Sequence, residues 1–341
     1  MQQKQMKAIT LPAYQGNIIR ALRSLEIQEK ELPVLNSDEV LIEIAAAPVN
    51  PSDLAFIQGG YNIRKALPAI PGFEGTGKVI QTASSTVAKN MNGKRVSFFS
   101  QSDRGGSWST HISVKAGDCV EICNELPVEQ AACFSVNPFT AYAMVELAGE
   151  HGSKAIIQNA AAGQVGKFIN VLAERASIQV INIVRKEEHV NILKTAGNKL
   201  VLWNQEEDFL QKLKELALSL DAHIAFDAVG GEQSGQLLGA MPDDSMLYLY
   251  GALGGRTLSE IPATDVIFSR KSIQGFNMNE WKDKLDSKSF LDISTRLQEF
   301  FSEGILKTEI QGSFPLAEYE KALMQYIRGM SAGKVLLLPK K

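Results

Sequence analysis

The middle of the chain alternates short apolar runs with helix-like stretches, and this rhythm constrains the fold more than any other feature. The runs are rich in β-branched and aromatic residues: AIIQN (155–159), IQVINIV (178–184), LVLW (200–203), HIAFDAV (223–229) and MLYLYGA (246–252). Such runs are typical of parallel strands covered on both faces. Helices are expected between them, at Gln164–Ala176, Lys186–Ala196, Glu207–Leu220 and Glu232–Met241. The alternation predicts an α/β, doubly wound parallel sheet over residues 128–276, with SIQGF (272–276) as a sixth strand.

The residues on either side follow a different rhythm. Before residue 127 the chain reads as short β-rich segments separated by turns: Val40–Ala46, Gly77–Gln81, Arg95–Phe99 and His111–Val114. This pattern predicts a compact, barrel-like β domain. After residue 276 come two helical stretches, near 290–303 and 316–328, and a last strand, GKVLLLP (333–339).

One terminal strand cannot form a domain alone, so we expect it to rejoin the N-terminal β-rich region. The predicted domains are therefore residues 1–127 together with 277–341, and residues 128–276 between them. An active site is expected in the cleft between the two.

Length, charge and cysteine content set the broad class. A chain of 341 residues exceeds what one hydrophobic core normally serves. A net charge of -3 without a basic, aromatic-interleaved run argues against a nucleic-acid or anionic-membrane partner. No apolar stretch approaches the roughly 20 residues that cross a bilayer, and the first residues lack the apolar core of a signal peptide. Three cysteines suit a reducing compartment, so a cytoplasmic location is expected.

The segment Ala155–Gly166, AIIQNAAAGQVG, has the form of a dinucleotide-binding turn. Against the template G-x-G-x-x-G, the three glycine positions hold Ala161, Gly163 and Gly166. Gly163 would let the backbone approach a pyrophosphate, and Gly166 would let the helix pack on the strand. The helix N-terminus offers N–H donors to the phosphates. The cofactor contacts expected here are Asn159, Ala161, Gly163, Gln164, Val165 and Gly166. The alternative is a small-residue turn needed only for packing.

Arg185 distinguishes between the two nicotinamide dinucleotides. It lies 19 residues after Gly166 (185 − 166), where an NAD-binding chain usually carries Asp or Glu for the ribose 2′-hydroxyl. A guanidinium cannot accept that hydrogen bond but can pair with a 2′-phosphate. NADPH is therefore the expected cofactor. The alternative is that Arg185 and Lys186 are only the solvated start of a helix.

Several segments, taken together, carry a family resemblance: VNPSDLAFIQGGY (49–61), LPAIPGFEGTG (67–77), NPFTAY (137–142), IIQNAAAGQVG (156–166) and GKVLL (333–337). They resemble the zinc-independent branch of the medium-chain dehydrogenase/reductase superfamily, and most closely quinone oxidoreductases and mitochondrial-type 2-enoyl thioester reductases. The resemblance implies a GroES-like catalytic domain plus a Rossmann domain, a homodimer, and hydride transfer from NADPH to an activated double bond. Gln164 and the stretch NIRKALPAI (62–70) depart from the family pattern.

The positions of the zinc ligands in zinc-dependent relatives hold other residues here. Those relatives carry a Cys near the NPSD segment, a His in a Gly-His-Glu turn and four Cys in one loop. This chain has Ser52 in the first segment, Phe73 in the turn, and no Cys in Gln101–His111. Without thiolates or imidazoles a tetrahedral zinc site cannot be assembled, so no metal is expected.

Tyr61 is the expected catalytic residue, because it follows Gly-Gly where the enoyl reductases carry their active-site tyrosine. A phenol is protonated at neutral pH and can act as an acid or a hydrogen-bond donor. Alternatively, Tyr61 is a gate or packing residue. Asn50 is expected to position the substrate carbonyl or the nicotinamide ribose, although Asn before Pro is also a common turn starter. Trp108 either walls the cleft or belongs to the core.

The remaining contacts are implied by the resemblance, position by position. Thr140 is expected on the nicotinamide side, Tyr250, Gly251 and Ala252 at the nicotinamide ribose, and Phe276 and Met278 beside the nicotinamide ring. Lys334 is expected to reach the cofactor phosphates or to be a surface lysine. Glu74 and Asp227 are expected to be structural.

These expectations leave three hypotheses for function. The first is an NADPH-dependent, zinc-free reductase of activated C=C bonds, in a 2-enoyl thioester or an α,β-unsaturated carbonyl. The second is an NADPH:quinone oxidoreductase on the same scaffold. The third, of another class, is a non-catalytic NADPH-binding structural or sensor protein.

Overall fold

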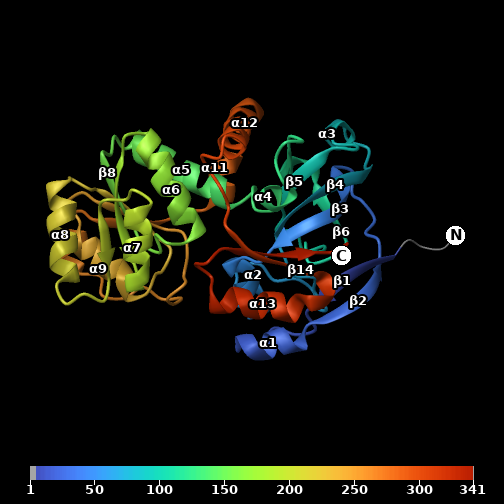
Figure 1. Ribbon diagram of the computed structural model, residues 1–341, viewed down its shortest axis with the longest axis horizontal. Helices are drawn as coiled ribbons and strands as arrows, with labels where there is room; N and C mark the ends of the chain where they lie inside the picture. The colour runs from blue at the N-terminus through green and yellow to red at the C-terminus, as the bar shows by residue number, and fades with distance from the viewer. Residues whose placement is uncertain (1–4, 341) are drawn as a thin grey trace. The chain divides into compact units, whose positions relative to one another are not determined.

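The computed structural model describes residues 5–340, and their contacts divide the chain into two units. One unit runs up to Val136 and resumes at Leu291, and the other is Asn137–Phe290 (Figure 1). The helix α4, Val128–Ala132, packs on strands of the first unit, while α11, Met278–Asp283, packs on a helix of the second. Along the chain, the two units meet after residues 136 and 290, whereas the expected domain boundaries lie after residues 127 and 276. The expected boundaries stay a prediction.

The second unit is built on a six-stranded parallel sheet. Its strands are β8 Ala155–Gln158, β9 Gln179–Val184, β10 Val201–Trp203, β11 Ile224–Asp227, β12 Met246–Leu249 and β13 Ser272–Gly275. They lie in the order β10-β9-β8-β11-β12-β13. Numbered within the unit this order is 3-2-1-4-5-6, that of a Rossmann domain. The predicted doubly wound parallel sheet is confirmed.

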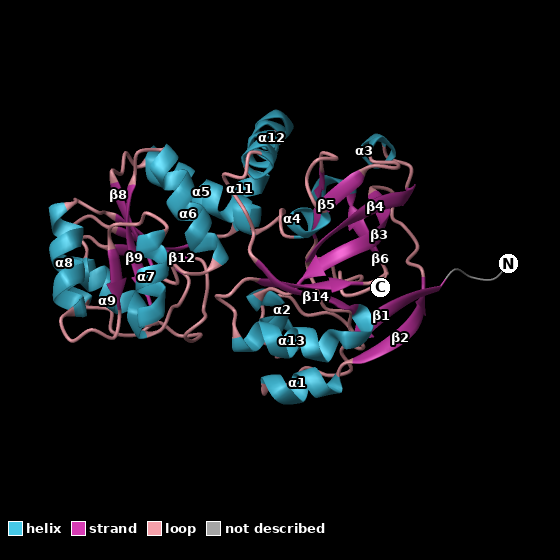
Figure 2. Ribbon diagram, viewed as in Figure 1, coloured by secondary structure: helices cyan, strands magenta, loops and turns pink. Residues whose placement is uncertain are grey.

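The four helices predicted for this unit are present, and their bounds lie within two residues of those expected. Those predicted are α6 Gln164–Arg175, α7 Glu187–Thr195, α8 Phe209–Ser219 and α9 Glu232–Ala240 (Figure 2). The helix α5, Asn137–Glu150, was not expected. Nine of its fourteen residues are buried, so it lacks the polar face that makes a helix visible in a sequence. A short helix, α10 Ala263–Ile267, precedes β13.

The first unit is rich in β structure, as predicted. Its larger sheet runs in the order β14-β15-β3-β4-β5-β7, with β6 paired to β3. The strands are β3 Glu39–Pro48, β4 Glu74–Thr82, β5 Arg95–Phe99, β6 His111–Lys115, β7 Cys119–Glu121, β14 Ile310–Pro315 and β15 Lys334–Leu338. β15 pairs antiparallel with β3, which confirms that the last strand rejoins the N-terminal sheet.

Two further strands, β1 Gln5–Thr10 and β2 Glu26–Glu31, form a separate pair that the sequence did not predict. The sequence of β2, EIQEKE, offers no apolar face. Helices α1 Ile18–Ser24, α2 Pro51–Ile57, α3 Thr86–Asn90 and α13 Tyr319–Arg328 complete the unit, and α12 spans Ser287–Ser302.

The core of the first unit is aromatic at its centre. Phe56, Phe73, Phe98 and Trp108 are all fully buried. Trp108 is therefore a core residue, and the indole N–H donates to the Pro48 carbonyl at 3.4 Å. Its alternative role as a wall of a substrate cleft is wrong, because a ring with no exposed surface is already packed on all sides. Within residues 5–340 no helix is long and apolar enough to span a membrane.

Candidate functional site

The turn after β8 has the geometry of a phosphate-binding turn. The helix α6 begins at Gln164, with Val165 and Gly166 in its first turn and Gly163 as its N-cap, and no side chain caps it. A Cβ on Gly166 would lie 2.6 Å from the Ala161 carbonyl oxygen, so this position requires glycine. An uncapped N-terminus reached by a turn of small residues suits a pyrophosphate.

Asn159 and Asp227 lock the ends of the two central strands together. The Asn159 amide donates to the Asp227 carboxylate, and its carbonyl oxygen accepts from the Ala228 N–H at 2.7 Å. Asp227 also accepts from the N–H groups of Val229 and Gly230, at 2.7 and 2.9 Å. The structural role expected for Asp227 is confirmed. The expected cofactor contact of Asn159 stays a prediction. In the structure, both the nitrogen and the oxygen of its side-chain amide already have partners within the protein.

Basic side chains gather around the end of β9. Arg185 is exposed, and its carbonyl accepts from the Trp203 indole N–H at 3.1 Å. Burial lowers the pKa of the His189 imidazole, while Glu188 raises it and Lys186, Lys167 and Arg185 lower it further. Arg185, Lys186, Lys167 and His189 therefore lie close enough to interact electrostatically. Their combined positive potential would attract a phosphate. The sequence reasoning missed Lys167 and His189, although Lys167 directly follows Gly166.

The other residues expected at the cofactor follow neighbouring strands. Tyr250, Gly251 and Ala252 come after β12, while Phe276 and Met278 come after β13. In a parallel sheet these ends lie along one edge, together with the turn after β8. A Cβ on Gly251 would lie 2.5 Å from the Ala228 carbonyl oxygen. Burial raises the pKa of the Tyr250 phenol. Thr140 is 8% exposed in α5.

Within the first unit, Asn50 is the centre of a buried polar cluster made of Asn50, Asp53, Glu74 and Lys334. Asn50 precedes α2, and its amide donates to a Glu74 carboxylate oxygen at 2.9 Å. Its carbonyl oxygen accepts from the Lys334 ammonium. Asp53 accepts from the backbone N–H groups of Asn50 and Phe73, at 2.7 and 3.2 Å. Each of the four is at most 4% exposed.

The Lys334 ammonium thus lies near two carboxyl groups, those of Asp53 and Glu74, and all three are buried. Burial raises the pKa of Asp53 and of Glu74 to about 7 each, and the charge of Lys334 opposes both shifts. Glu74 also accepts from the Val136 N–H at 2.9 Å, so its expected structural role is confirmed. Lys334 is not a surface lysine. Its contact with cofactor phosphates stays a prediction, and in the structure its ammonium binds Asn50.

Tyr61 lies in the loop after α2, partly buried against this cluster. Its hydroxyl oxygen accepts from the Gln101 amide at 2.7 Å, and its ring lies 5.2 Å from the Phe73 ring. Burial raises the pKa of the phenol, the charge of Asp53 raises it further, and Gln101 lowers it. Tyr61 is therefore protonated at neutral pH. The sequence reasoning missed Gln101, because its loop contains no motif.

The positions of zinc ligands in other chains lie around this cluster: Ser52 is in α2 next to Asp53, Phe73 directly precedes β4, and Gln101 follows β5. Phe73 is fully buried, beneath the Tyr61 ring, and Asn50 is bonded to Glu74 and Lys334. Across residues 5–340 no group of three or more His, Cys, Asp or Glu side chains is placed to hold a metal ion.

Comparison with known proteins agrees with this arrangement. Residues 36–124 match the "Alcohol dehydrogenase GroES-like domain" family and residues 165–293 the "Zinc-binding dehydrogenase" family. A protein from Mesorhizobium loti, described as a proposed NADPH:quinone reductase, is 31% identical, with a TM-score of 0.90 over 98% of each chain. The chain belongs to the medium-chain dehydrogenase/reductase superfamily.

Within this superfamily the chain is related to enoyl thioester reductases and quinone reductases at modest identity. The mitochondrial enoyl-[acyl-carrier-protein] reductase of Mus musculus is 28% identical over 94% of this chain and 87% of its own. The complex of Etr1p with NADP and crotonyl-CoA shares the fold, with a TM-score of 0.78, 24% identity, and coverage of 98% of this chain and 100% of its own.

The buried cluster makes a prediction about stability. Lys334→Met removes the buried cation whose charge favours the ionised forms of both Asp53 and Glu74, and we expect it to lower the free energy of unfolding by about 3–5 kcal/mol at pH 8. Folding raises both carboxyl pKa values from about 4 to about 7, so their contribution to stability falls as pH rises through that window. The loss caused by Lys334→Met should therefore shrink at pH 5, where both carboxyls are protonated.

Urea unfolding followed by circular dichroism at pH 8 and pH 5 measures this difference. Lys340→Met is the matched control, because Lys340 pairs at 2.7 Å with Glu43 while 59% exposed. Its effect should stay within about 0.5 kcal/mol at both pH values. Equal effects of the two substitutions would contradict the role given to Lys334.

Proposed function

We propose that the protein is an NADPH-dependent, zinc-free reductase of activated C=C bonds, in a 2-enoyl thioester or an α,β-unsaturated carbonyl. The proposal rests on the protonation and the hydrogen bonding of the Tyr61 hydroxyl. The phenol is protonated, half-buried beside the Phe73 ring, and bonded through its oxygen to Gln101 at 2.7 Å. That arrangement suits a proton donor better than a surface gate.

The chemistry follows from the proton balance of the reduction. Bound NADPH supplies a hydride for the β-carbon of the substrate. Negative charge then develops on the carbonyl oxygen, and one proton must reach the α-carbon. The Tyr61 hydroxyl donates a hydrogen bond to that charge or delivers the proton, and the Phe73 ring limits the access of water.

Asn50 is proposed to act as a positioning residue in this reaction. Both ends of its amide are occupied, by Glu74 and Lys334. Through Asp53, which bonds the backbone of Asn50 and of Phe73, the same cluster holds the Phe73 ring beneath Tyr61.

The relatives support both candidate substrates. The mouse enzyme is named as an enoyl reductase and Etr1p is solved with crotonyl-CoA, which supports the thioester. The Mesorhizobium loti protein supports quinone reduction.

Tyr61→Phe separates the two candidates. Loss of the hydroxyl should lower kcat/KM for crotonyl-CoA by about 10²–10⁴-fold, since general acid catalysis contributes that much. Reduction of 1,4-naphthoquinone, which needs no proton at carbon, should change far less. Steady-state NADPH oxidation with each substrate measures both values.

Tyr319→Phe is the matched control, because the Tyr319 hydroxyl donates to the Leu25 carbonyl at 2.6 Å, away from the cluster. Unchanged crotonyl-CoA reduction by Tyr61→Phe would eliminate Tyr61 as the acid. NADPH binding by the wild type without turnover of either substrate would favour the non-catalytic hypothesis.

NADPH is proposed as the cofactor because Arg185, Lys167 and Lys186 each interact electrostatically with His189. Their positive potential would attract the 2′-phosphate that NADH lacks. A charge-assisted hydrogen bond contributes about 1.5–3 kcal/mol. Arg185→Ala should therefore raise the Kd of NADPH roughly 10–100-fold and leave that of NADH nearly unchanged. Fluorescence titration of both cofactors measures this, with Arg175→Ala, at the far end of α6, as control. Equal weakening of both cofactors would contradict the 2′-phosphate contact.

A homodimer is proposed on the edge of the six-stranded sheet. β13 ends the strand order, and the adjacent Val266, Ile267 and Phe268 are 47%, 65% and 73% exposed. An apolar surface beside an open strand edge favours pairing with a second copy. The cytoplasmic location stays a prediction, and the mouse relative is named as a mitochondrial enzyme.

A further inference from the structure

Gln101 is the second residue of the loop between β5 and β6, the same segment that carries four Cys ligands in zinc-dependent relatives. Its side-chain amide donates to the Tyr61 hydroxyl oxygen at 2.7 Å. Two segments 40 residues apart in the sequence therefore meet at the hydroxyl that the proposed reaction uses.

The direction of this hydrogen bond decides what Tyr61 can do. A phenol has one hydrogen to donate, and its oxygen can also accept. Because the Gln101 N–H donates, the Tyr61 oxygen is the acceptor and its own hydrogen is not used in this contact. The hydroxyl can then donate that hydrogen to a substrate while Gln101 holds its oxygen.

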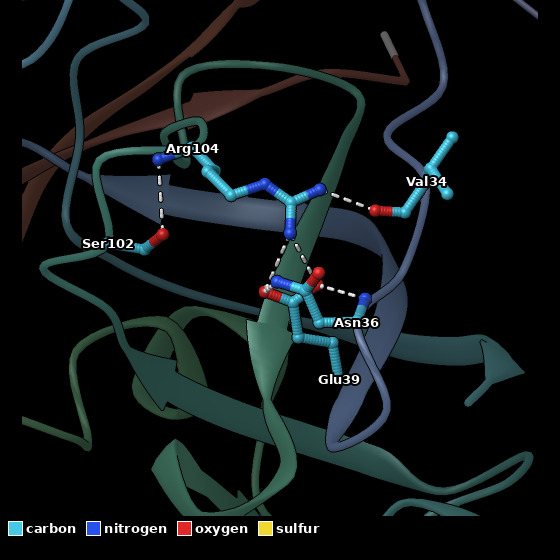
Figure 3. Close-up of polar contacts among 5 residues, drawn as sticks. All are labelled: Val34, Asn36, Glu39, Ser102 and Arg104. Carbon is cyan, nitrogen blue, oxygen red and sulfur yellow. Dashed lines mark hydrogen bonds and ion pairs between the residues drawn. The ribbon is translucent and has the colours of Figure 1, made fainter. Parts of the chain in front are cut away.

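An ion pair anchors the loop three residues further on (Figure 3). One guanidinium nitrogen of Arg104 lies 3.1 and 3.3 Å from the two carboxylate oxygens of Glu39, and another donates to the Val34 carbonyl. The Glu39 side chain is only 6% exposed and also accepts from the Asn36 N–H at 2.8 Å. The Ser102 hydroxyl accepts from the Arg104 backbone N–H at 3.1 Å, which closes the turn.

A buried lysine ties this loop to the segment that carries Tyr61. Lys65 is 5% exposed, and its ammonium donates to the Gly105 carbonyl and lies 5.0 Å from the centre of the Phe73 ring. Burial lowers its pKa to about 8, against the opposing charges of Asp53 and Asp103. Next to it, a Cβ on Gly106 would lie 2.1 Å from the Pro71 carbonyl oxygen, so the two segments are in close backbone contact.

We propose that Gln101 is a positioning residue that holds the Tyr61 oxygen and leaves the Tyr61 hydrogen for the substrate, with Arg104–Glu39 and Lys65 keeping the Gln101 loop in place. This inference rests on the proposed function, in which Tyr61 is the donor. It also separates the donor role of Tyr61 from a gating role, since a gate needs no fixed hydroxyl.

Two substitutions test the proposal. Gln101→Met removes the donor and keeps the chain length, and we expect kcat for crotonyl-CoA to fall about 3–10-fold with KM nearly unchanged, the effect of one hydrogen bond. Gln101→Glu, when ionised, can only accept, so it would take the Tyr61 hydrogen and lower kcat further. Naphthoquinone reduction should change less than two-fold in both. The exposed Gln205→Met serves as control.

A spectroscopic measurement tests the contact without turnover. With 3-fluorotyrosine incorporated, ¹⁹F NMR follows the titration of the Tyr61 phenol, whose signal is assigned by its loss in Tyr61→Phe. The Gln101 N–H stabilises the phenolate. Its removal in Gln101→Met should therefore raise the pKa of Tyr61, and the carboxylate of Gln101→Glu should raise it more. Circular dichroism and the unfolding temperature show whether each variant is folded.

The possible results distinguish a failure of the positioning role of Gln101 from a failure of the proposed reductase function. An unchanged Tyr61 titration in folded Gln101→Met and Gln101→Glu overturns the positioning role, whatever the activity. A shifted titration with wild-type kcat for crotonyl-CoA also overturns it, because the contact then exists without serving the reaction. If the wild type reduces no enoyl thioester, the proposed function fails, and the titration alone decides whether Gln101 holds Tyr61.

Discussion

The first unit depends on one buried polar arrangement, the hydrogen bonding of the Asn50 side chain between Glu74 and Lys334. These residues come from the start of α2, the start of β4 and the start of β15. Buried polar groups are costly unless they are paired, so the three segments must meet for any of them to be satisfied. The cluster therefore joins the C-terminal strand to the N-terminal sheet more specifically than apolar packing does.

The same arrangement is connected to the Tyr61 hydroxyl, the proposed proton donor, through two contacts. Asp53 bonds the backbone of Phe73, and the Phe73 ring supports Tyr61. From the opposite side, the loop anchored by Arg104 and Lys65 brings Gln101 to the Tyr61 oxygen. Where zinc-dependent relatives use ligand residues, this chain uses amides, carboxyls and a buried ammonium to order the same region. This arrangement is compatible with the proposed chemistry, in which the Tyr61 phenol supplies the proton.

The sequence predicted the parts of the fold that follow a simple period. The strands of the second unit are apolar runs between amphipathic helices, and their order follows from the doubly wound pattern. The helix α5 was missed because burial on most sides removes the period. The turn after β8 was recognisable despite Ala161, since only Gly166 is in a position where a side chain cannot fit.

The site was predicted only where a residue sits in a motif. Tyr61, Asn50 and Lys334 were singled out in this way, and their functional roles stay predictions, but their hydrogen-bond partners were not foreseen. Gln101 lies 40 residues from Tyr61, and Lys334 lies 284 residues from Asn50, so no local spacing reports either contact. Lys65 lies in the stretch NIRKALPAI, which contains no motif, and only the tertiary structure places it over the Phe56 and Phe73 rings.

We propose, as the central claim, that this protein reduces a carbon–carbon double bond with hydride from NADPH and a proton from a phenol. The most direct measurement is the fate of the label when crotonyl-CoA is incubated with NADPH deuterated at the transferable C4 position. Mass spectrometry and NMR of the product should find butyryl-CoA with one deuterium at the β-carbon and a solvent-derived hydrogen at the α-carbon. Recovery of unlabelled crotonyl-CoA, with the deuterated NADPH intact or consumed only when a quinone is added, would contradict the claim.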